Sequence, residues 1–278
     1  MNFTIGRFLR TLGVGSALAA LPWCAHAQSP ALWEVGGFAG LITAPAYPGS
    51  TERLNRSLVF PYFVYRGQRI SVDRDGIDAR WQLAPGYELD WGASGSFPAR
   101  SNDVLARQGM PDLGTLVEFG PRLKVKLPTP GTGLTMALDM PLREVFEVNG
   151  GTRSQGLVFE PTLVLDAANL ADGWSLTAKA GLAWGDQAMH QYFYGVSPQY
   201  ATPQRPAFEA QAGLMSARAS LSTSKSVGPD LRVFGYARMD YFGLGANTAS
   251  PLYQQNSSPT WGLGMTWTLG RSEARAGE

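Results

Sequence analysis

Few residues in this sequence can do acid–base chemistry near neutral pH. The chain has two histidines, His26 and His190, and one cysteine, Cys24. An imidazole titrates near neutrality and is the usual general base of a hydrolase. His26 and Cys24 lie in an N-terminal segment that we expect to be removed. His190 is therefore the candidate for catalysis.

The surroundings of His190 give little support to a catalytic role. Residues 190–192 read His-Gln-Tyr, which lacks the His-x-Ser arrangement of outer-membrane esterases. Ser197, Asp186 and Asp166 are possible partners if the fold brings them near, but their spacing does not require it. We interpret His190 as a polar loop residue beside an aromatic cluster and the protein as a non-enzyme. We keep a lipid-acting barrel hydrolase that uses His190 only as the least favoured of three functional interpretations.

The sequence also contains no motif for binding a cofactor or a metal ion. Gly-x-Gly pairs occur at 131/133, 243/245 and 262/264, but each lacks the remaining glycine spacing and the following helix of a phosphate-binding loop. Without Cys24 and His26, thiolate and histidine-rich metal sites are excluded. We expect no cofactor and no metal.

The N-terminus has the features of a secretory signal peptide. Arg7 and Arg10 precede an apolar run that closes on Ala-His-Ala at residues 25–27. We expect cleavage between Ala27 and Gln28, so that residues 1–27 are the signal. Removing them leaves 21 basic against 22 acidic residues, which gives no reason to propose nucleic-acid binding.

Alternation of apolar and polar residues dominates the rest of the chain. In the string YELDWGASGSF from Tyr87, one face carries aromatic and small residues and the other carries acids and serines. This pattern predicts an all-β fold of twelve strands, with ten as the alternative. The expected strands are 33–41, 57–65, 69–83, 87–97, 113–127, 133–146, 155–166, 174–185, 206–213, 216–226, 230–242 and 260–269.

This assignment has one internal conflict. The long connections 42–56, 98–112, 186–205 and 243–259 do not all fall at one end of the strands. The boundary between the ninth and tenth strands is the expected place of the error. Pro61, Pro121 and Pro161 fall within predicted strands, where a missing N–H is tolerated at bulges and edges.

Aromatic spacing favours a membrane barrel over a secreted sandwich. Trp174 and Trp184 lie ten residues apart on one strand face, as do Tyr87 and Phe97. Ten residues of a strand tilted by about 45° rise about 23 Å, close to the roughly 25 Å between the aromatic girdles of outer-membrane barrels. We predict a transmembrane antiparallel β-barrel over residues 28–270, with a polar tail over 271–278.

The opposite strand faces carry charges of both signs, which a polar lumen accepts. A soluble sandwich with a solvated face is the alternative interpretation. A narrow diffusion pore is the second functional reading. However, charges of opposite sign across a small lumen pair and close it more readily than they select an ion.

Three short stretches resemble the MipA/OmpV family, which is named for an interaction with a murein-degrading lytic transglycosylase. The most specific is TAPAYPGSTERLNRSLVFPYFVYRG, with its Tyr-x-Gly-Ser element at 47–50 and Pro61, Tyr65, Arg66 and Gly67 after it. Tyr194-Gly195-Val196 and Ser250-Pro251 continue the likeness.

The resemblance implies a barrel of the Gram-negative cell outer membrane, embedded in lipid. It also implies a scaffold that brings a lytic transglycosylase and a penicillin-binding protein together at the peptidoglycan. Other relatives are porin-related surface proteins. One departure from outer-membrane barrels is that Trp267-Thr268-Leu269 is followed by a polar tail rather than by a terminal aromatic residue.

The same stretches supply the candidate loop or interaction residues. These are Tyr47, Pro48, Gly49, Ser50, Tyr194, Gly195, Ser250 and Pro251. Pro48-Gly49 is a turn signal, and the Ser50 hydroxyl can satisfy local backbone groups. We expect Tyr47, Gly49 and Ser50 to shape a fixed loop at the membrane boundary, with partner binding as the lesser possibility.

Overall fold

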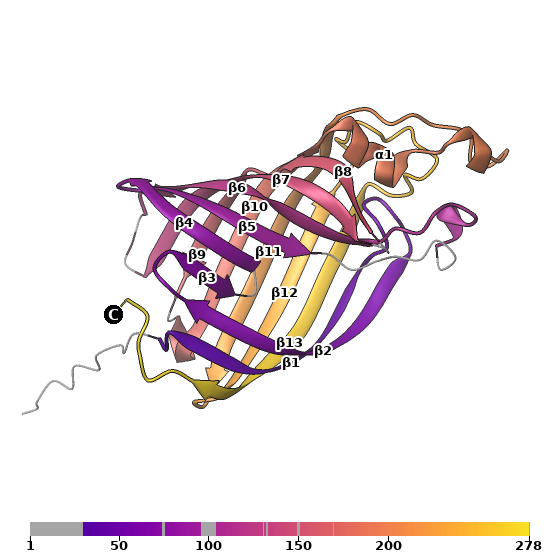
Figure 1. Cartoon of the computed structure of the whole chain (residues 1–278). Coiled ribbons are helices and arrows are strands. Elements are labelled where there is room, and N and C mark those ends of the chain that lie inside the picture. The colour runs from indigo at the N-terminus through magenta and orange to yellow at the C-terminus, as the bar shows by residue number, and fades with distance from the viewer. Residues whose placement is uncertain are drawn as a thin grey trace, which may run out of the picture.

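The chain forms one antiparallel sheet that closes on itself (Figure 1). The computed structural model describes residues 30–73, 76–95, 104–129, 131, 133–148, 151–168 and 170–277. The strands are β1 (Trp33–Pro45), β2 (Arg53–Arg66), β3 (Ile70–Asp73), β4 (Gly76–Ala84), β5 (Tyr87–Gly95), β6 (Thr115–Leu127), β7 (Leu134–Val148), β8 (Thr152–Phe159), β9 (Thr162–Ala167), β10 (Trp174–Gly185), β11 (Gly213–Val227), β12 (Leu231–Tyr241) and β13 (Ser257–Arg271). Closure comes from β1, which pairs with β2 on one side and with β13 on the other.

Two of these segments, β8 and β9, are one interrupted strand. Both lie between β7 and β10 and pair with each. The break falls at Glu160 and Pro161, where proline has no N–H to give to the ladder. The barrel therefore has twelve strands, which confirms the predicted fold class and count.

The other two strand prolines also lie where pairing is incomplete. Pro61 lies on β2 opposite Gly37, in a stretch whose second side meets no described strand. Pro121 pairs with Trp91 of β5, but the β6–β7 ladder skips residues 120–121. Proline is tolerated at both positions for the reason that applies at sheet edges and bulges.

Two predicted strands were wrong, and their errors compensate in the count. Residues 69–83 form the hairpin β3–β4 rather than one strand, because the chain reverses between Asp73 and Gly76. Residues 206–212 lie in a loop, where Phe208 makes only an isolated bridge to Val196, and Gly213 begins β11. The prediction lacks one strand before β5 and has one too many after β10. It therefore gives every strand from β5 to β10 the wrong direction.

With these corrections the long connections lie together. The turn end of the barrel carries the short connections 67–69, 85–86, 128–133, 168–173 and 228–230. The loop end carries the long connections 46–52, 96–114, 186–212 and 242–256, and two tight hairpins, β3–β4 and β7–β8, turn toward the same side. Outer-membrane barrels have this asymmetry, with short turns in the periplasm and longer loops outside.

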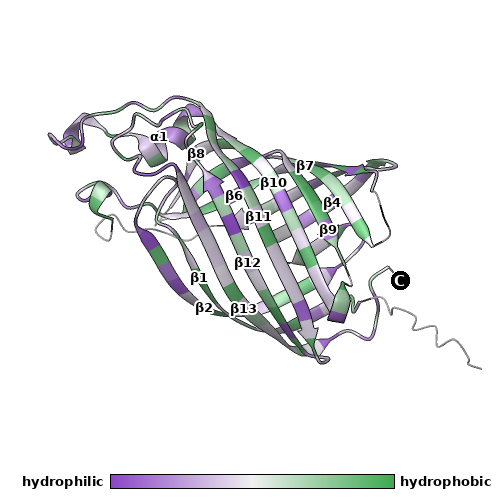
Figure 2. Cartoon of the chain, turned by 180° about the vertical axis from the view of Figure 1, so that it is seen from behind, coloured by the Kyte–Doolittle hydropathy of each residue, from purple (hydrophilic) through white to green (hydrophobic). Residues whose placement is uncertain are grey.

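The outer surface of the barrel is apolar and the inner surface is polar. On β13 the exposed side chains are Trp261, Leu263, Met265, Trp267 and Leu269, whereas Ser258 and Thr260 on the other face are buried. Figure 2 shows the barrel from the opposite side to Figure 1, with apolar residues recurring along the strands. An exposed apolar surface this extensive is typical of contact with lipid rather than with water.

The predicted girdle residues lie near strand ends. Trp174 begins β10 and Trp184 lies one residue before its end, while Tyr87 begins β5. Phe97, and the predicted cleavage residues Ala27 and Gln28, lie outside the described residues. In the described part of the chain, no helix is long and apolar enough to cross a membrane.

Depth in the membrane should decide the cost of a charge on the outer face. Leu263 lies near the middle of β13 and Leu269 near its end, and both are more than half exposed. We expect Leu263→Arg to lower the free energy of unfolding by about 2–4 kcal/mol and Leu269→Arg by about 0–1 kcal/mol. Denaturant titration in lipid vesicles measures both free energies. Equal losses in the two variants would contradict the different membrane depths assigned to Leu263 and Leu269.

Candidate functional site

A folded cap closes the loop end of the barrel. We use "the cap" for residues 46–52, 104–114, 186–212 and 242–256, which gather above the strands together with helix α1 (Gln187–Tyr194) (Figure 1). The cap has its own hydrophobic core, made by Ala46, Tyr47, Val104, Leu113, Val196 and Leu252. Loops with a shared core are fixed in position, unlike solvated loop tips.

Helix α1 is anchored at both ends within this cap. Its first turn is capped by the Asp186 carboxylate, which accepts a hydrogen bond from the Met189 N–H at 2.8 Å. The helix stops at Gly195, whose N–H donates to the Gln191 carbonyl. Two short 3₁₀ turns, η2 (Leu105–Arg107) and η4 (Pro198–Tyr200), complete the cap.

The cap brings together the loop residues of the three family-like stretches, whereas Tyr65 and Arg66 of the first stretch lie at the turn end of β2. The Tyr47 hydroxyl donates to the Leu252 carbonyl at 2.7 Å. Gly49 adopts φ 81°, and its carbonyl accepts from the backbone N–H groups of Gln254 and Gln255 at 3.0 and 3.1 Å. A left-handed φ favours glycine over any residue with a side chain. The turn at residues 47–50 thus contacts a loop that lies some 200 residues later in the chain.

The other candidate residues lie in the same contact. Ser50 is fully buried, and the Ser250 hydroxyl donates to the Tyr194 carbonyl at 2.7 Å. Tyr194 and Gly195 are buried, while Pro48 and Pro251 are half-buried. All eight candidates therefore lie in the cap, and six of them are buried there among contacts within the chain.

A buried cation lies beneath Tyr47, and the sequence patterns did not identify it. Arg107 is 3% exposed, stands 5.9 Å from the centre of the Tyr47 ring, and donates to the carbonyls of Phe193 and Pro111. Burial lowers the pKa of Arg107, and the nearby tyrosines oppose that change. Burial also raises the pKa of Tyr47 to about 12, although Arg107 acts in the other direction. A buried arginine in an irregular loop leaves no periodic signal in a sequence.

His190 is fully buried, and both of its ring nitrogens have partners. Nδ1 lies 2.8 Å from the Asn247 amide nitrogen and Nε2 lies 3.0 Å from the Gly213 carbonyl oxygen. We assign a neutral ring that accepts from Asn247 and donates to Gly213. Burial lowers the pKa of His190, against smaller opposing effects of Gly213 and Asp186.

The suggested hydrolytic partners of His190 are used elsewhere. Asp186 caps α1, and Asp166 accepts from the Thr177 hydroxyl at 2.6 Å on the neighbouring strand. Ser197 is exposed and precedes η4. Within the described ranges, no hydrogen bond joins His190 to a serine or a carboxylate.

Below the cap, ion pairs cross-link the inner wall. We call this the charge network: Arg122 with Asp90 (2.8 Å) and Asp78 (3.5 Å), Arg143 with Glu118 (3.5 Å), Arg218 with Glu160 and Asp240 (3.2 Å to the latter), and Arg238 with Asp240 (2.7 Å). A cavity of about 240 Å³ remains among Arg122, Asp139, Arg143, Lys179 and their neighbours. Asp90 and Asp240 are buried, and leaving a buried charge without its partner costs about 3–5 kcal/mol, so the arginines that pair with them are fixed on the inner wall.

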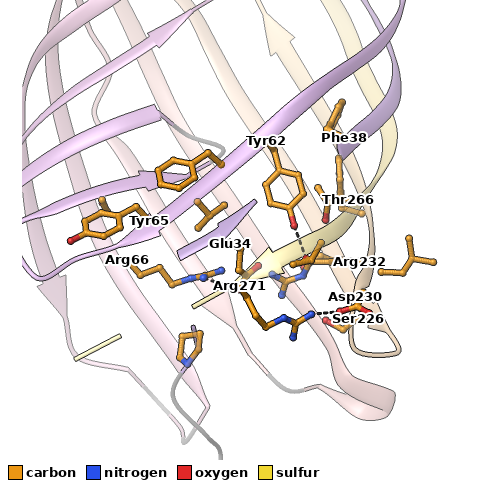
Figure 3. Close-up of a pocket in the computed structure, with 18 of the residues that line it drawn as sticks. Glu34, Phe38, Tyr62, Tyr65, Arg66, Ser226, Asp230, Arg232, Thr266 and Arg271 are labelled. Carbon is orange, nitrogen blue, oxygen red and sulfur yellow. Dashed lines mark hydrogen bonds and ion pairs between the residues drawn. The ribbon is translucent and has the colours of Figure 1, made fainter. Parts of the chain in front are cut away.

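A larger cavity, of about 1200 Å³, lies toward the turn end (Figure 3). We call it the lower cavity. Its wall includes the Arg66–Glu34 pair at 2.8 Å, the Arg271–Asp230 pair, and Tyr62, which shares a 2.6 Å hydrogen bond with Thr268. Over the described ranges, no cluster of His, Cys, Asp and Glu is suited to hold a metal ion.

A closed twelve-stranded barrel with an apolar exterior, a polar lumen and a folded cap defines a membrane barrel of the outer-membrane type. The model of the family described as "MltA-interacting protein MipA" matches residues 37–269, from β1 to β13. The chain therefore belongs to the MipA family.

Two solved outer-membrane proteins are similar to this chain at low sequence identity. A structure titled as the NanC porin in a rhombohedral crystal form is 10% identical, with a TM-score of 0.37, and the match covers 86% of this chain and 100% of that one. Outer membrane phospholipase A from Escherichia coli is 12% identical, with a TM-score of 0.33, over 84% of this chain and 92% of that one. No curated protein matches.

The Tyr47 hydroxyl should stabilise the cap measurably. We expect Tyr47→Phe to destabilise the cap by about 1–3 kcal/mol, because the buried Leu252 carbonyl loses its donor. Proteolysis within 242–256 should become faster. Tyr253→Phe is the matched control, since its hydroxyl bonds to Asn256 at the exposed surface and its loss should cost no more than about 0.5 kcal/mol. Equal effects of the two substitutions would contradict the role given to Tyr47.

His190 should make the cap less stable in acid. Its folded-state pKa lies below the ordinary value near 6.5, so the unfolded cap binds a proton at a higher pH than the folded cap. The free energy of cap opening should fall as pH drops below about 6.5, by at most about 1.4 kcal/mol per pH unit. Hydrogen exchange of α1, corrected for intrinsic rates, measures this. The slope should disappear in His190→Gln, and a slope that survives there belongs to another group.

Proposed function

We propose that this protein is a non-enzymatic barrel of the outer membrane that organises murein enzymes from its periplasmic end. The partner class is a lytic transglycosylase, as the family's name suggests, together with a penicillin-binding protein that the resemblance implies. In this orientation the turn end faces the periplasm and the cap faces outward.

The observation that carries this proposal is the difference between the two ends of the barrel. At the outer end, six of the eight candidate loop residues are buried in the cap and leave little surface for a partner. At the periplasmic end, residues 272–277 fold back beside residues 30–32. The Leu32 N–H donates to the Ala274 carbonyl and the Ala276 N–H to the Pro30 carbonyl, both at 2.9 Å. This ordered edge, with the short turns around it, is the surface available to periplasmic enzymes.

The two other readings have less support. For a hydrolase, His190 has both ring nitrogens occupied by Asn247 and Gly213. For a diffusion pore, the cap and the charge network stand between the lower cavity and the outer end. Both arrangements favour a binding role over a reaction or a flux.

Single-cysteine cross-linking tests the proposed orientation and partner together, because the expected mature chain has no thiol. Ala84→Cys and Glu273→Cys put an exposed thiol at the periplasmic end, and Leu105→Cys puts one in the cap. In native envelopes, we expect the first two to cross-link to a lytic transglycosylase and the third to give no such product. Mass spectrometry of the adducts identifies the partner.

Three outcomes would count against the proposal. A transglycosylase adduct from Leu105→Cys alone would reverse the orientation. Absence of any murein enzyme in the adducts of all three variants would remove the scaffold role. Reproducible single-channel steps from the purified protein in planar bilayers would favour the pore instead.

A further inference from the structure

The inner wall of the barrel contains an apolar ladder where a polar lining is expected. Phe38 of β1 stacks on Phe60 of β2 with ring centres 4.4 Å apart, and on Phe234 of β12 at 5.5 Å. All three line the lower cavity, and Phe60 is 46% exposed. Lumens of outer-membrane barrels are polar. Three stacked phenylalanines that face an aqueous space leave apolar area in water, which an apolar ligand would cover.

Among the residues that the structure describes, the barrel wall is incomplete beside these phenylalanines. β2 pairs with β1 along its whole length, but with β3 only at Tyr65 and Arg66. Residues 57–64 therefore pair with β1 on one side and with no described strand on the other. Figure 1 shows the short β3 meeting β2 only near the end of β2. Backbone groups facing lipid without partners cost several kcal/mol each, so such an edge persists where it borders a cavity.

The lower cavity reaches around this edge. Its wall includes eight consecutive residues of the chain, Phe60 to Gly67, whereas β10 and β13 contribute alternate residues such as Ser175 and Thr177. Successive strand residues point to opposite faces, so a run of consecutive lining residues means that the cavity touches both sides of β2. Phe63, on the outer face, is 51% exposed. The cavity thus opens sideways, through the wall, onto the apolar exterior.

The turn end of the same cavity carries more arginines than carboxylates. Its wall carries four arginines, Arg66, Arg80, Arg232 and Arg271, and two carboxylates, Glu34 and Asp230. Glu34 and Asp230 pair with Arg66 and Arg271, and Arg80 also meets Glu88 at 3.6 Å. Figure 3 shows Arg66, Arg232 and Arg271 around the lower part of the cavity, with Phe38 and Tyr62 above them. Arginine is suited to bind phosphate through paired N–H donors.

The distance between ladder and charges matches one lipid leaflet. Phe60 and Arg66 are six residues apart on β2, which is about 20 Å along the strand and about 14 Å along the membrane normal at a tilt near 45°. Half of a hydrocarbon core is about 15 Å. A chain whose head lies at the arginines would thus reach the phenylalanine ladder at the membrane centre.

We propose that the lower cavity binds an anionic phospholipid of the inner leaflet, which enters sideways at the free edge of β2. One acyl chain lies against Phe38, Phe60 and Phe234, and the phosphate lies among the arginines at the turn end. This inference takes its orientation from the proposed function and is independent of any murein partner. The cavity volume of about 1200 Å³ exceeds the roughly 300–1,000 Å³ of ordinary small-molecule sites, which leaves room for a chain and a head group.

Photo-cross-linking in defined vesicles tests this site without any other protein. The purified chain is reconstituted in phosphatidylethanolamine vesicles that contain phosphatidylglycerol with a photoactivatable acyl chain, and the labelled peptides are mapped by mass spectrometry. We expect label on inward-facing Phe38, Phe60 or Phe234. Label confined to outward-facing residues such as Leu263 would identify ordinary surrounding lipid and overturn the proposal.

Matched variants separate the ladder from general effects on the barrel. Phe60→Gln should lower lumen labelling about tenfold, because a polar side chain replaces apolar contact with the acyl chain. Phe119→Gln is the control, since Phe119 is equally exposed, at 47%, but lies on the outer face of β6. Heat-modifiable migration on gels checks that both variants fold. Equal labelling of the two variants would overturn the role of the ladder.

The head-group end has its own test. The double substitution Arg66→Gln/Arg271→Gln should abolish the preference for the phosphatidylglycerol probe over a phosphatidylethanolamine probe with the same chain, while chain labelling at Phe60 continues. A preference that is unchanged would overturn the assignment of the phosphate. Displacement of the lipid label by soluble acidic saccharides, with no preference among lipid head groups, would assign the cavity to a sugar ligand instead.

Discussion

Closure of the backbone hydrogen-bond ladder is the constraint on which the rest of this structure depends. Lipid offers no partners to N–H and C=O groups, so a membrane sheet must pair its first strand with its last, as β1 and β13 do here over most of their length. The alternating strand faces, the polar lumen and the gathering of loops at one end all follow from that closure. Residues 57–64 of β2 depart from this closure, because they pair with no described strand on one side. They lie beside the lower cavity, which keeps their unpaired backbone groups away from lipid.

Alternation and aromatic spacing were sufficient to predict the barrel, because both reflect the geometry of a membrane-spanning strand, but the strand count agreed only because two errors compensated. They could not locate every reversal. Within 69–83 the apolar residues keep alternating up to and after the turn between Asp73 and Gly76, so the hairpin looks like a single strand. Asp-Gly at 75–76 was the available turn signal. The short alternation in 206–213 imitates a strand, although Gly213 is where β11 begins.

The candidate residues were predicted less completely than the fold. Resemblance selected Tyr47, Gly49, Ser50 and Ser250, but the contacts of the first three join loops about 200 residues apart, which no local pattern encodes. Arg107 and Asn247 were missed for the same reason, since each is buried only when several loops meet. The stacked phenylalanines were also missed, because an apolar residue at an inward position looks like a gap in the pattern rather than a feature.

The cap has a consequence for the order of folding. Its contacts join residues 46–52 to residues 242–256, so the entropy of closing a loop of about 200 residues must be met before any of them can form. Local hairpins have no such cost and form early, whereas contacts of high sequence separation form slowly. The β1–β13 seam brings the two loops side by side, and the cap core then forms around Tyr47 and Leu252. A cap that resists protease therefore reports that the seam beneath it has already closed.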